Sequence, residues 1–379
     1  MKEYQLMKYS MPVFLYLKAF SSTGGLEKFN RAFIKAINTL FAGKLLLLSS
    51  HEKIIDKNYA GSALHYGFNG NKILFSVFSI LKVWNCNPVI LGHINLWPVG
   101  MWIRILYPTK KIILITHGIE VWGKINKGKK LMLEWCHMIV SVSNYTKNEI
   151  SKANPKLKES KFFILYNTID PYFNVPTQYN KPLNLLQKHK INENSKIIMT
   201  LTRMSAYEKY KGYDKVIEAL PIVKKKYPDI IYILAGKYDA EEIIRIKKII
   251  QFCNLEVNVI MPGFISEKDI SNYYLMADLF IMPSKKEGFG IVFIEAMACG
   301  LPVITGNTDG SVEAIMYGEL GTAIDCDSTH EIANAIISFF DTYNSSYEQC
   351  TNLQTKVLQH FSFQIYLDNV KKIFSTLHA

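Results

Sequence analysis

The chain has 379 residues, which is more than one ordinary hydrophobic core holds, so we expect two domains. Hydrophobic residues make up 49% of the chain and charged residues 20%, a composition that excludes a disordered protein. The six cysteines show no Cys-x-x-Cys spacing, which argues against a zinc site or a disulfide framework and is typical of a reducing cytosol.

Charge is unevenly distributed along the chain. Residues 1–190 contain 26 Lys/Arg and 9 Asp/Glu, a net charge of +17, whereas the remaining 18 Lys/Arg and 23 Asp/Glu give −5. A basic half indicates an anionic partner, which could be nucleic acid, a phospholipid surface or a phosphate-bearing substrate. The alternative is that these lysines only keep the protein soluble. No recognisable nucleic-acid-binding module accompanies the charge, so we expect no nucleic-acid partner.

In chain order, short apolar runs alternate with stretches of helical periodicity. The first runs are PVFLYL, KLLLLSS, NPVILGHIN, KIILITHG and HMIVSVS. After an Asn-, Pro- and Lys-rich stretch at residues 170–195, which we interpret as a linker, the runs are KIIMTLTR, IIYILAG, NVIMPGF, LFIMPS and LPVITG. Continuous apolar strands separated by helices are typical of parallel sheets covered on both faces. The sequence therefore predicts two doubly wound α/β domains, with ligands at the carboxyl ends of their strands.

Three segments bear on membranes and targeting. For NKILFSVFSILKVW, residues 71–84, we predict a buried core helix, with insertion into a membrane surface as the alternative. The longest uncharged stretch, residues 83–103, contains polar residues and two prolines, and it is a poor membrane span. Near the amino terminus, Lys18 interrupts an apolar run, which argues against a secretory leader.

The segment KKEGFGIVFIEAMACG, residues 285–300, points most directly to a ligand. It follows the apolar run LFIMPS and indicates an exit loop and then a helix that ends near Gly300. Glycines in the loop let a ligand approach the backbone, and amides at a helix N-terminus favour an anion. The amides of Gly290, Ile291 and Val292 are predicted to form this anion site, and Gly288 and Phe289 before them are predicted to contact the donor as well.

Two glutamates, Glu287 and Glu295, bracket this anion site. Carboxylates do not bind phosphate, but they accept hydrogen bonds from the hydroxyls that a sugar and a ribose supply. An amide-lined anion site between two hydroxyl acceptors suits a nucleotide sugar. On spacing alone, a surface glutamate and a helix-capping glutamate would explain the pattern equally well.

This Glu-x7-Glu segment, followed by AMACGLPVI, closely resembles the signature of the retaining family 4 glycosyltransferases of GT-B fold, within glycosyl transferases group 1. Six other segments resemble the family's segments in the expected order: SSTGGLEKF, THGIEVW, SVSNYTKNEI, LYNTIDPYF, LTRMSAYEKYKGYDKVIEAL and DGSVEAI. The resemblance covers nearly the whole chain. It implies two Rossmann-like domains facing a central cleft, an acceptor-binding one at residues 1–175 and a nucleotide-sugar-binding one at residues 190–361. It also implies that a helix at about 362–379 packs back on the first domain.

The resemblance also implies roles for single residues. Arg203 and Lys211 match the arginine and lysine that hold the donor diphosphate, where fixed cations stabilise the leaving group without a metal. The longer SAYEKY insert leaves open whether Lys209 or Lys211 does so. His117 matches a histidine that faces the sugar. The implied catalytic residues are thus His117, Glu287, Arg203 and Lys211, and Glu295 would accept the ribose hydroxyls.

Further binding residues are expected in the first half. Gly24 and Gly25 follow the first strand, where the backbone can approach donor or acceptor. Glu120 and His93 are acceptor candidates, although Glu120 could only cap a helix and His93 could be a satisfied strand-end histidine. GKYDAEE, residues 236–242, departs from the family's Gly-x-Gly and puts a phosphate contact there in doubt. Asp325-Cys326-Asp327 imitates an Asp-x-Asp metal motif, but we interpret it as a turn and expect neither a metal nor another cofactor.

The resemblance implies a metal-independent retaining glycosyltransferase that moves a sugar from a nucleotide-sugar donor to a hydroxyl. The acceptor would be a glycan or a lipid-linked carrier, in bacterial surface polysaccharide synthesis such as O-antigen, capsule or lipopolysaccharide. We expect a cytoplasmic protein, peripheral on the inner face of the plasma membrane. A nucleotide-sugar 2-epimerase of the same fold and a non-catalytic nucleotide-sugar-binding protein are the alternatives. The sequence does not identify the sugar, the base, the acceptor or the oligomeric state.

Overall fold

The structure is a computed structural model that describes residues 11–343 and 346–377. Part of the amino-terminal segment weighed as a leader, residues 1–10, and the last two residues of the expected carboxyl-terminal helix lie outside the described residues. The chain divides into two compact units, Met1–Pro171 with Phe361–Ala379, and Tyr172–His360. None of the helices that the structure describes is long and apolar enough to cross a membrane.

Within the described residues, the first unit has a parallel sheet in the order β3-β2-β1-β4-β5-β6-β7. β1, β2, β4, β5 and β6 are buried along their whole length, as the continuous apolar runs predict. The strand bounds are β1 Val13–Tyr16, β2 Leu46–Ser49, β3 Leu64–Gly67, β4 Val89–Leu91, β5 Ile112–Thr116, β6 Met138–Ser141 and β7 Phe162–Ile164.

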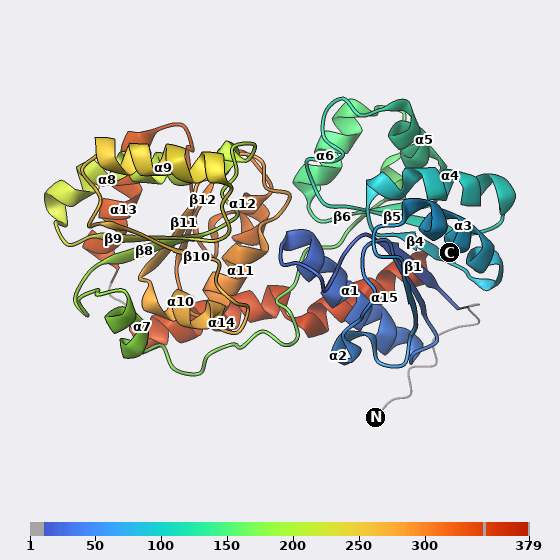
Figure 1. Ribbon diagram of the computed structural model, residues 1–379, viewed down its shortest axis with the longest axis horizontal. Helices are drawn as coiled ribbons and strands as arrows, with labels where there is room; N and C mark the ends of the chain where they lie inside the picture. The colour runs from blue at the N-terminus through green and yellow to red at the C-terminus, as the bar shows by residue number, and fades with distance from the viewer. Residues whose placement is uncertain (1–10, 344–345, 378–379) are drawn as a thin grey trace. The chain divides into compact units, whose positions relative to one another are not determined.

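Helices cover both faces of this sheet (Figure 1). α3, α4 and α5 lie on one face, where their apolar residues share a core with the strands. α1, α2 and α15 lie on the other. The helix bounds are α1 Gly25–Phe41, α2 Lys57–Ala60, α3 Lys72–Lys82, η1 Val83–Asn85, η2 Ile94–Leu96, α4 Trp97–Leu106, α5 Lys127–Trp135, α6 Asn144–Ala153, η3 Glu159–Lys161 and α15 Phe363–Thr376.

The last helix of the chain belongs to the first unit. The Phe374 ring of α15 meets the Phe41 ring of α1 edge-on at 4.9 Å between centroids, and Tyr366 meets Phe29 at 6.4 Å. Phe374 and Tyr366 are buried in this contact. Aromatic pairs of this geometry add to the stabilisation that burial gives. Two chain segments far apart in sequence therefore complete one hydrophobic layer.

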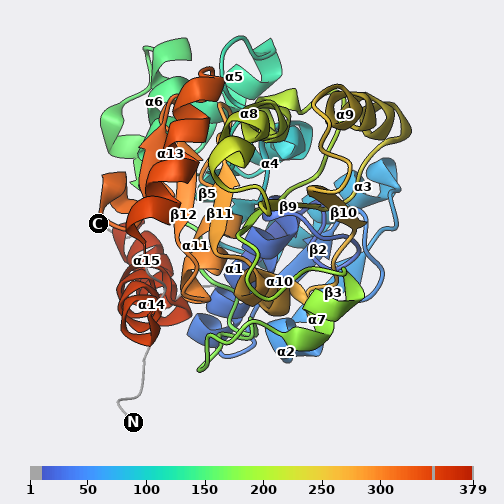
Figure 2. The same ribbon diagram turned by 90° about the vertical axis from the view of Figure 1, so that its left-hand side faces the viewer.

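The second unit has a parallel sheet, within the described residues, in the order β10-β9-β8-β11-β12-β13. In Figures 1 and 2, α8, α9 and α13 cover one face of it, and α10 and α11 cover the other. The strand bounds are β8 Ile197–Leu201, β9 Ile231–Ala235, β10 Val259–Gly263, β11 Leu279–Met282, β12 Val303–Gly306 and β13 Thr322–Ile324. The helix bounds are α7 Leu183–Lys188, η4 Lys209–Lys211, α8 Tyr213–Lys226, α9 Ala240–Phe252, α10 Ile270–Met276, α11 Ile291–Ala298, α12 Ser311–Ala314, η5 Met316–Gly318, α13 Thr329–Thr342 and α14 Tyr347–Phe361.

Side-chain caps set where several helices begin. Asp239 accepts a hydrogen bond from the Glu242 amide at 2.8 Å and starts α9, and Ser328 accepts from the Glu331 amide at 3.1 Å and starts α13. Each cap satisfies an amide that the first helical turn leaves without a partner. These local signals place the helices between strands, so that the predicted doubly wound parallel sheets are confirmed.

Two sequence interpretations need correction. We interpreted residues 170–195 as a linker, but from Tyr172 onward they include α7 and belong to the second unit. Ser271 Oγ donates to the Asn174 carbonyl at 2.7 Å, and Gln354 Nε2 donates to the Pro176 carbonyl at 2.9 Å. Residues 71–84 do form a helix, α3 with η1, but it is not a buried core helix. Phe75 is buried, whereas Ile73 and Leu81 on the same helix are exposed.

Candidate functional site

The loops that follow β8 and β11 meet at the carboxyl edge of the second sheet, where the strand order changes direction. The Lys285 amide donates to the Tyr210 carbonyl at 3.0 Å. Gly212 adopts φ +75°, and a Cβ there would collide with the Pro283 carbonyl. Only glycine therefore fits at this crossing of two backbones. The point where the order of a doubly wound sheet reverses is the usual place for a ligand.

Lys211 and Glu287 form an ion pair at this crossing. Their side chains are only 16% and 14% exposed, so both charges are largely withdrawn from water. Burial alone would lower the pKa of Lys211, but the charge of Glu287 and its hydrogen bond outweigh burial and raise that pKa. Lys211 is therefore a cation at neutral pH. The structure brings together two predicted site residues that lie far apart in sequence.

Arg203, the other predicted diphosphate residue, lies on the loop after β8 with its side chain 68% exposed. Its guanidinium forms a fork with Glu208, in which Nε donates to Oε2 at 2.9 Å. Burial alone would raise the pKa of Glu208, but Arg203 lowers it. Glu208 belongs to the SAYEKY insert, so the segment that departs from the family supplies a carboxylate to the predicted diphosphate arginine. Lys209 in the same insert is exposed.

The predicted anion site lies at the start of α11. Gly290 is the residue before the helix and has φ +87°, and a Cβ there would lie 2.5 Å from the Phe293 ring. The first-turn amides of Ile291 and Val292 follow it, and Phe289 is buried beneath the loop. Backbone amides at a helix N-terminus favour negative charge. Lys211, paired with Glu287, lies on the neighbouring loop as a fixed cation.

Asp309, which the sequence analysis did not single out, clamps the loop of Glu287. It accepts the Glu287 amide at 2.6 Å, the Ser311 amide at 2.9 Å and the Ser311 hydroxyl at 2.5 Å. Gly310 donates back to the Glu287 carbonyl at 2.9 Å. Burial, with a smaller contribution from the charge of Glu287, raises the pKa of Asp309 to about 6, although the hydrogen bonds oppose the change. Its position before the glycine of DGSVEAI was the only signal in the sequence.

Glu295, predicted to accept ribose hydroxyls, lies on α11 and is only 1% exposed. The Tyr274 hydroxyl donates to its Oε2 at 3.4 Å. Burial, and secondarily the charge of Glu295, raises the pKa of Tyr274 well above its ordinary value. The ribose contact stays a prediction.

In the first unit, His117 and His93 lie at the carboxyl edge of the sheet, after β5 and β4. Their rings stack with centroids 5.9 Å apart, and the Phe29 ring of α1 meets His117 edge-on at 4.8 Å. His117 Nε2 lies 2.8 Å from the Gly92 carbonyl, which can only accept, so Nε2 carries the proton. Burial lowers the pKa of His117 and lowers that of His93 to about 4. Both are neutral at pH 7, and Nδ1 is the acceptor nitrogen of His117.

Two neighbouring candidates have local partners. Glu120 accepts the His117 amide at 2.6 Å, so it closes the turn after β5. His93 Nδ1 accepts the Asn95 amide at 3.0 Å and starts η2. The His93 bond fits the alternative of a satisfied strand-end histidine, whereas Glu120 closes a turn and does not cap a helix. Their contact with an acceptor stays a prediction.

Gly24 and Gly25 lie where the loop after β1 enters α1. A Cβ at Gly25 would meet no atom within 4 Å, whereas one at Gly24 would lie 2.7 Å from the Glu27 carboxylate. The loop is held by Glu52, which the sequence did not suggest. Its Oε1 accepts the amides of three consecutive residues, Ala19 at 2.6 Å, Phe20, and Ser21 at 2.9 Å. No residue pattern indicates this bond, because 31 residues or more separate the partners.

The remaining sequence candidates lie in loops of the second unit. Gly236 packs against the Thr202 carbonyl, and Met204 forms a bridge with Tyr238, so GKYDAEE supports the loop of Arg203. Asp325 Oδ1 accepts the Asp327 amide at 2.9 Å, as in a turn, and Lys285 pairs with Asp327. Among the described residues, no three His, Cys, Asp or Glu side chains are grouped as a metal site.

Comparison with known proteins shows which proteins the second unit resembles. Residues 183–356 match the family model described as glycosyl transferases group 1. The chain is 24% identical over 237 residues to the GDP-mannose-dependent alpha-(1-6)-phosphatidylinositol monomannoside mannosyltransferase of Mycobacterium tuberculosis, which covers 60% of this chain and 59% of that protein. The chain thus spans less than two thirds of that relative's length.

Solved structures show the fold of both units. Anabaena HepE in complex with UDP and glucose matches 96% of this chain and 100% of its own, with a TM-score of 0.78 at 16% identity. A glycosyltransferase from Rickettsia africae matches 97% of this chain and 98% of its own, with a TM-score of 0.77 at 21% identity. The predicted GT-B fold is confirmed, and residues 183–356 are similar in sequence to the glycosyl transferases group 1.

Proposed function

We propose that this chain is a metal-independent, retaining glycosyltransferase that moves a sugar from a nucleotide-sugar donor to a hydroxyl of a glycan or lipid-linked acceptor. The observation that carries the proposal is the buried pair of Lys211 and Glu287 beside the amides that start α11. One edge thus offers a fixed cation, an amide-lined anion site and a hydroxyl acceptor. These are the groups that a nucleoside diphosphate joined to a sugar requires.

The proposed chemistry places charge stabilisation on the diphosphate. As the bond to the sugar breaks, negative charge grows on the leaving phosphate, and Lys211, Arg203 and the α11 amides stabilise it. The acceptor hydroxyl attacks from the side of the departing diphosphate, and a phosphate oxygen takes its proton. Glu287 accepts a sugar hydroxyl and keeps Lys211 in place. Neutral His117 offers Nδ1 as a further hydroxyl acceptor.

The comparisons support the donor class and leave its identity open. HepE was solved with UDP and glucose, and the mycobacterial relative is named for GDP-mannose. That relative's acceptor, phosphatidylinositol monomannoside, is a lipid. We therefore propose a lipid-linked acceptor in surface polysaccharide synthesis, and a location on the inner face of the plasma membrane, which the net charge of +17 on residues 1–190 supports.

A donor panel tests the proposal. UDP-, GDP- and ADP-sugars are screened for thermal stabilisation, and the stabilising donor is then incubated with candidate glycan and lipid acceptors in EDTA. We expect one nucleotide class to stabilise the protein, and the product's anomeric configuration by NMR to match that of the donor. Isomerisation of the donor at C2 would instead identify an epimerase. Activity lost in EDTA and restored by Mg²⁺ or Mn²⁺ would contradict the metal-free mechanism.

A further inference from the structure

α3 exposes apolar side chains, although it lies on the surface of its unit. Phe75 and Ser79 face the core, whereas Ile73, Val77 and Leu81, spaced four residues apart along one side, are exposed. A surface helix normally turns polar residues to water and apolar residues to the core. Here the outer side of the helix is at least as apolar as the inner one.

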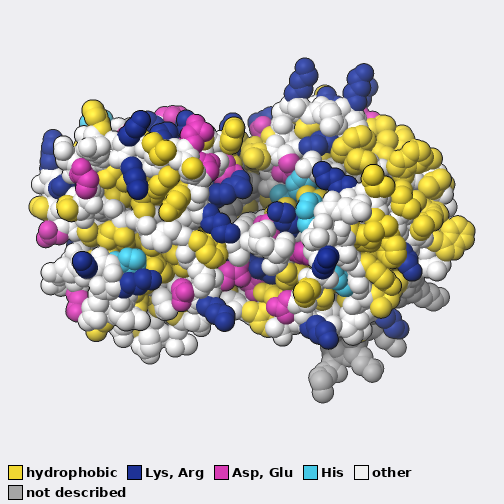
Figure 3. Space-filling view, in the orientation of Figure 1, with side chains coloured by type: hydrophobic (Ala, Val, Ile, Leu, Met, Phe, Trp, Pro, Cys, Tyr) yellow, Lys and Arg dark blue, Asp and Glu magenta, His cyan; other side chains and the backbone are white. Residues whose placement is uncertain are grey.

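The exposed apolar side continues onto the neighbouring elements. α3 packs against α4 and η1, and the Trp84 ring of η1 meets the Tyr107 ring after α4 at 5.9 Å. Figure 3 shows apolar side chains gathered on the part of the first unit where Figure 1 places α3 and α4. We call this surface the α3–α4 patch, and its residues, which are 52–79% exposed, are Ile73, Leu74, Val77, Leu81, Trp84, Trp102, Ile105 and Leu106. Contiguous exposed apolar patches usually mark binding surfaces.

The charge within the segment that forms the patch has one sign. Residues 57–119, which contain the whole patch, carry six Lys/Arg and no Asp or Glu. Lys72 and Lys82 stand at the two ends of α3, and Lys82 Nζ lies over the Phe78 ring at 5.4 Å. Lys110 Nζ donates to the Trp84 carbonyl at 2.6 Å, and Lys111 beside it is exposed. Lysines at an apolar rim can lay their methylenes on the apolar surface and reach outward with the charge.

We propose that the α3–α4 patch docks the protein on an anionic lipid bilayer, with Trp84 and Trp102 at the headgroup level. The inference deepens the membrane part of the proposed function and rests on it. Tryptophan favours the interface between lipid and water, basic residues are attracted to anionic headgroups, and aliphatic side chains enter the acyl boundary. A second copy of this chain fits less well, because a two-fold contact would set the same lysines against one another, and residues 57–119 supply no carboxylate to pair with them.

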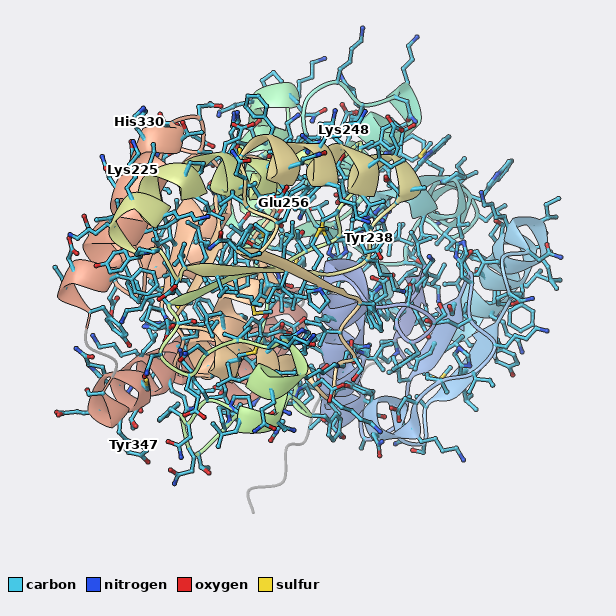
Figure 4. All side chains as sticks on the ribbon, turned by 60° about the vertical axis from the view of Figure 1, so that its left-hand side comes forward. Lys225, Tyr238, Lys248, Glu256, His330 and Tyr347 are labelled. Atoms are coloured by element: carbon cyan, nitrogen blue, oxygen red, sulfur yellow. The ribbon has the colours of Figure 1, made fainter. Side chains whose placement is uncertain are left out.

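The second unit serves as an internal comparison. Its outer helices α8 and α9 turn Lys225 and Lys248 to solvent, as Figure 4 shows, and carry acidic residues as well. Ile244 and Phe252 on α9 and Val257 after it are exposed apolar residues, but Glu241, Lys247 and Lys248 stand among them. These three apolar residues offer a matched control for the loss of exposed apolar side chains outside the patch.

The test is co-sedimentation with vesicles of phosphatidylcholine alone and of phosphatidylcholine with about one third phosphatidylglycerol. The patch variant is I73Q/V77Q/L81Q, a charge variant is K72E/K82E/K111E, and the matched control is I244Q/F252Q/V257Q. We expect the full chain to bind the anionic vesicles and to be released by about 0.5 M salt, which screens charges beyond a few ångströms. Each set of patch substitutions should weaken binding about tenfold or more, and the control should bind like wild type.

Tryptophan fluorescence locates the contact. All five tryptophans lie between residues 84 and 135. A lipid brominated near the headgroup should quench the fluorescence of Trp84 and Trp102. The variant W84F/W102F should therefore lose most of this quenching. Equal vesicle binding by the patch variant and wild type, no binding by wild type, or a dimer in solution that I73Q/V77Q/L81Q dissociates would each overturn the proposal. Donor stabilisation without lipid is measured on the same proteins. Its failure would contradict the sugar-transfer proposal and not the docking surface.

Discussion

The carboxyl edges of the two sheets share one arrangement but differ in electrostatics. Each sheet reverses its strand order beside its first strand, and each holds a loop there with a buried carboxylate, Glu52 in the first unit and Asp309 in the second. Beyond the clamp they differ. The first edge carries the stacked neutral histidines His93 and His117, whereas the second carries the charged pair of Lys211 and Glu287.

This difference shows how one fold prepares two kinds of surface. Neutral acceptors and donors suit the hydroxyls of a sugar, because they add no charge to a buried place. Fixed charges suit a diphosphate. Burial, with a smaller contribution from the charge of Glu287, raises the pKa of Asp309, whereas burial lowers the pKa of His93. The two edges should therefore titrate in opposite directions.

The largest expected effect comes from removing the cation of the second edge. Lys211→Met should lower turnover by about 10² to 10³, because the leaving diphosphate loses a preorganised charge and Glu287 stays buried without its partner. Turnover is measured with saturating donor, and Lys209→Met is the matched control because that side chain is exposed. If Lys209→Met lowers turnover more than Lys211→Met, Lys209 is the lysine that holds the diphosphate. The pair of Lys211 and Glu287 would then not be what distinguishes the second edge from the first.

Acid should weaken the first edge. The pKa of His93 in the folded state, about 4, lies below the ordinary value of 6.5, so its contribution to stability is present above pH 6.5 and is lost as pH falls toward 4. The full loss is about 3 kcal/mol. Because all five tryptophans lie in the first unit, urea unfolding followed by tryptophan fluorescence reports that unit alone. His93→Asn, which can still accept the Asn95 amide, should flatten the pH dependence of the free energy of unfolding. An unchanged pH dependence would contradict a neutral His93 in the folded protein.

A rise in pH from about 4 to 7 should destabilise the carboxyl edge of the second sheet. The pKa of Asp309 in the folded state, about 6, lies above the ordinary 3.8, so its contribution is present below pH 4 and is lost as pH rises through 6. The change is again about 3 kcal/mol. Hydrogen exchange of peptides from residues 283–290 should rise between pH 5 and 7, after correction for intrinsic rates, and Asp309→Asn should remove that step. A step of the same size in Asp309→Asn would assign the titration to another group.

The smallest effect concerns the insert. Glu208→Gln should strengthen nucleoside diphosphate binding about two- to five-fold. In the wild type, Arg203 must give up its ion pair with Glu208 before it can contact a phosphate, and in the variant it need not. Isothermal titration calorimetry with UDP and GDP measures it, and Glu218→Gln on α8 is the control for loss of a surface carboxylate. Weaker binding would mean that Glu208 orients Arg203 toward the ligand and is part of the site.

The sequence predicted the two sheets well because their strands are continuous apolar runs, and this pattern does not depend on distant contacts. It also placed Lys211 and Glu287 on loops that the structure brings together. It missed Glu52 and Asp309, because a carboxylate that accepts distant backbone amides carries no local pattern.

Surface exposure was harder to predict than secondary structure. The stretch at residues 71–84 is apolar on both sides of its helix. From the sequence alone, such a helix could be buried in protein on both sides or have one side on the surface. The structure distinguishes the two possibilities, because Phe75 is buried in the core and Leu81 is exposed on the surface. Glu208 shows the same limit, since its pairing with Arg203 depends on the turn that the insert makes.

The place of α15 has a consequence for how the protein forms during synthesis. The second unit is continuous from Tyr172 to His360, whereas the first needs Phe363–Thr376 to cover α1 through Phe374 and Tyr366. On the ribosome, amino-terminal domains usually finish folding first. Here we expect the reverse order. The second unit can close once residue 360 has emerged, whereas the first unit keeps part of the apolar side of α1 uncovered until Phe363–Thr376 has left the exit tunnel. Nascent chains arrested before residue 361 should therefore bind chaperones through their first half.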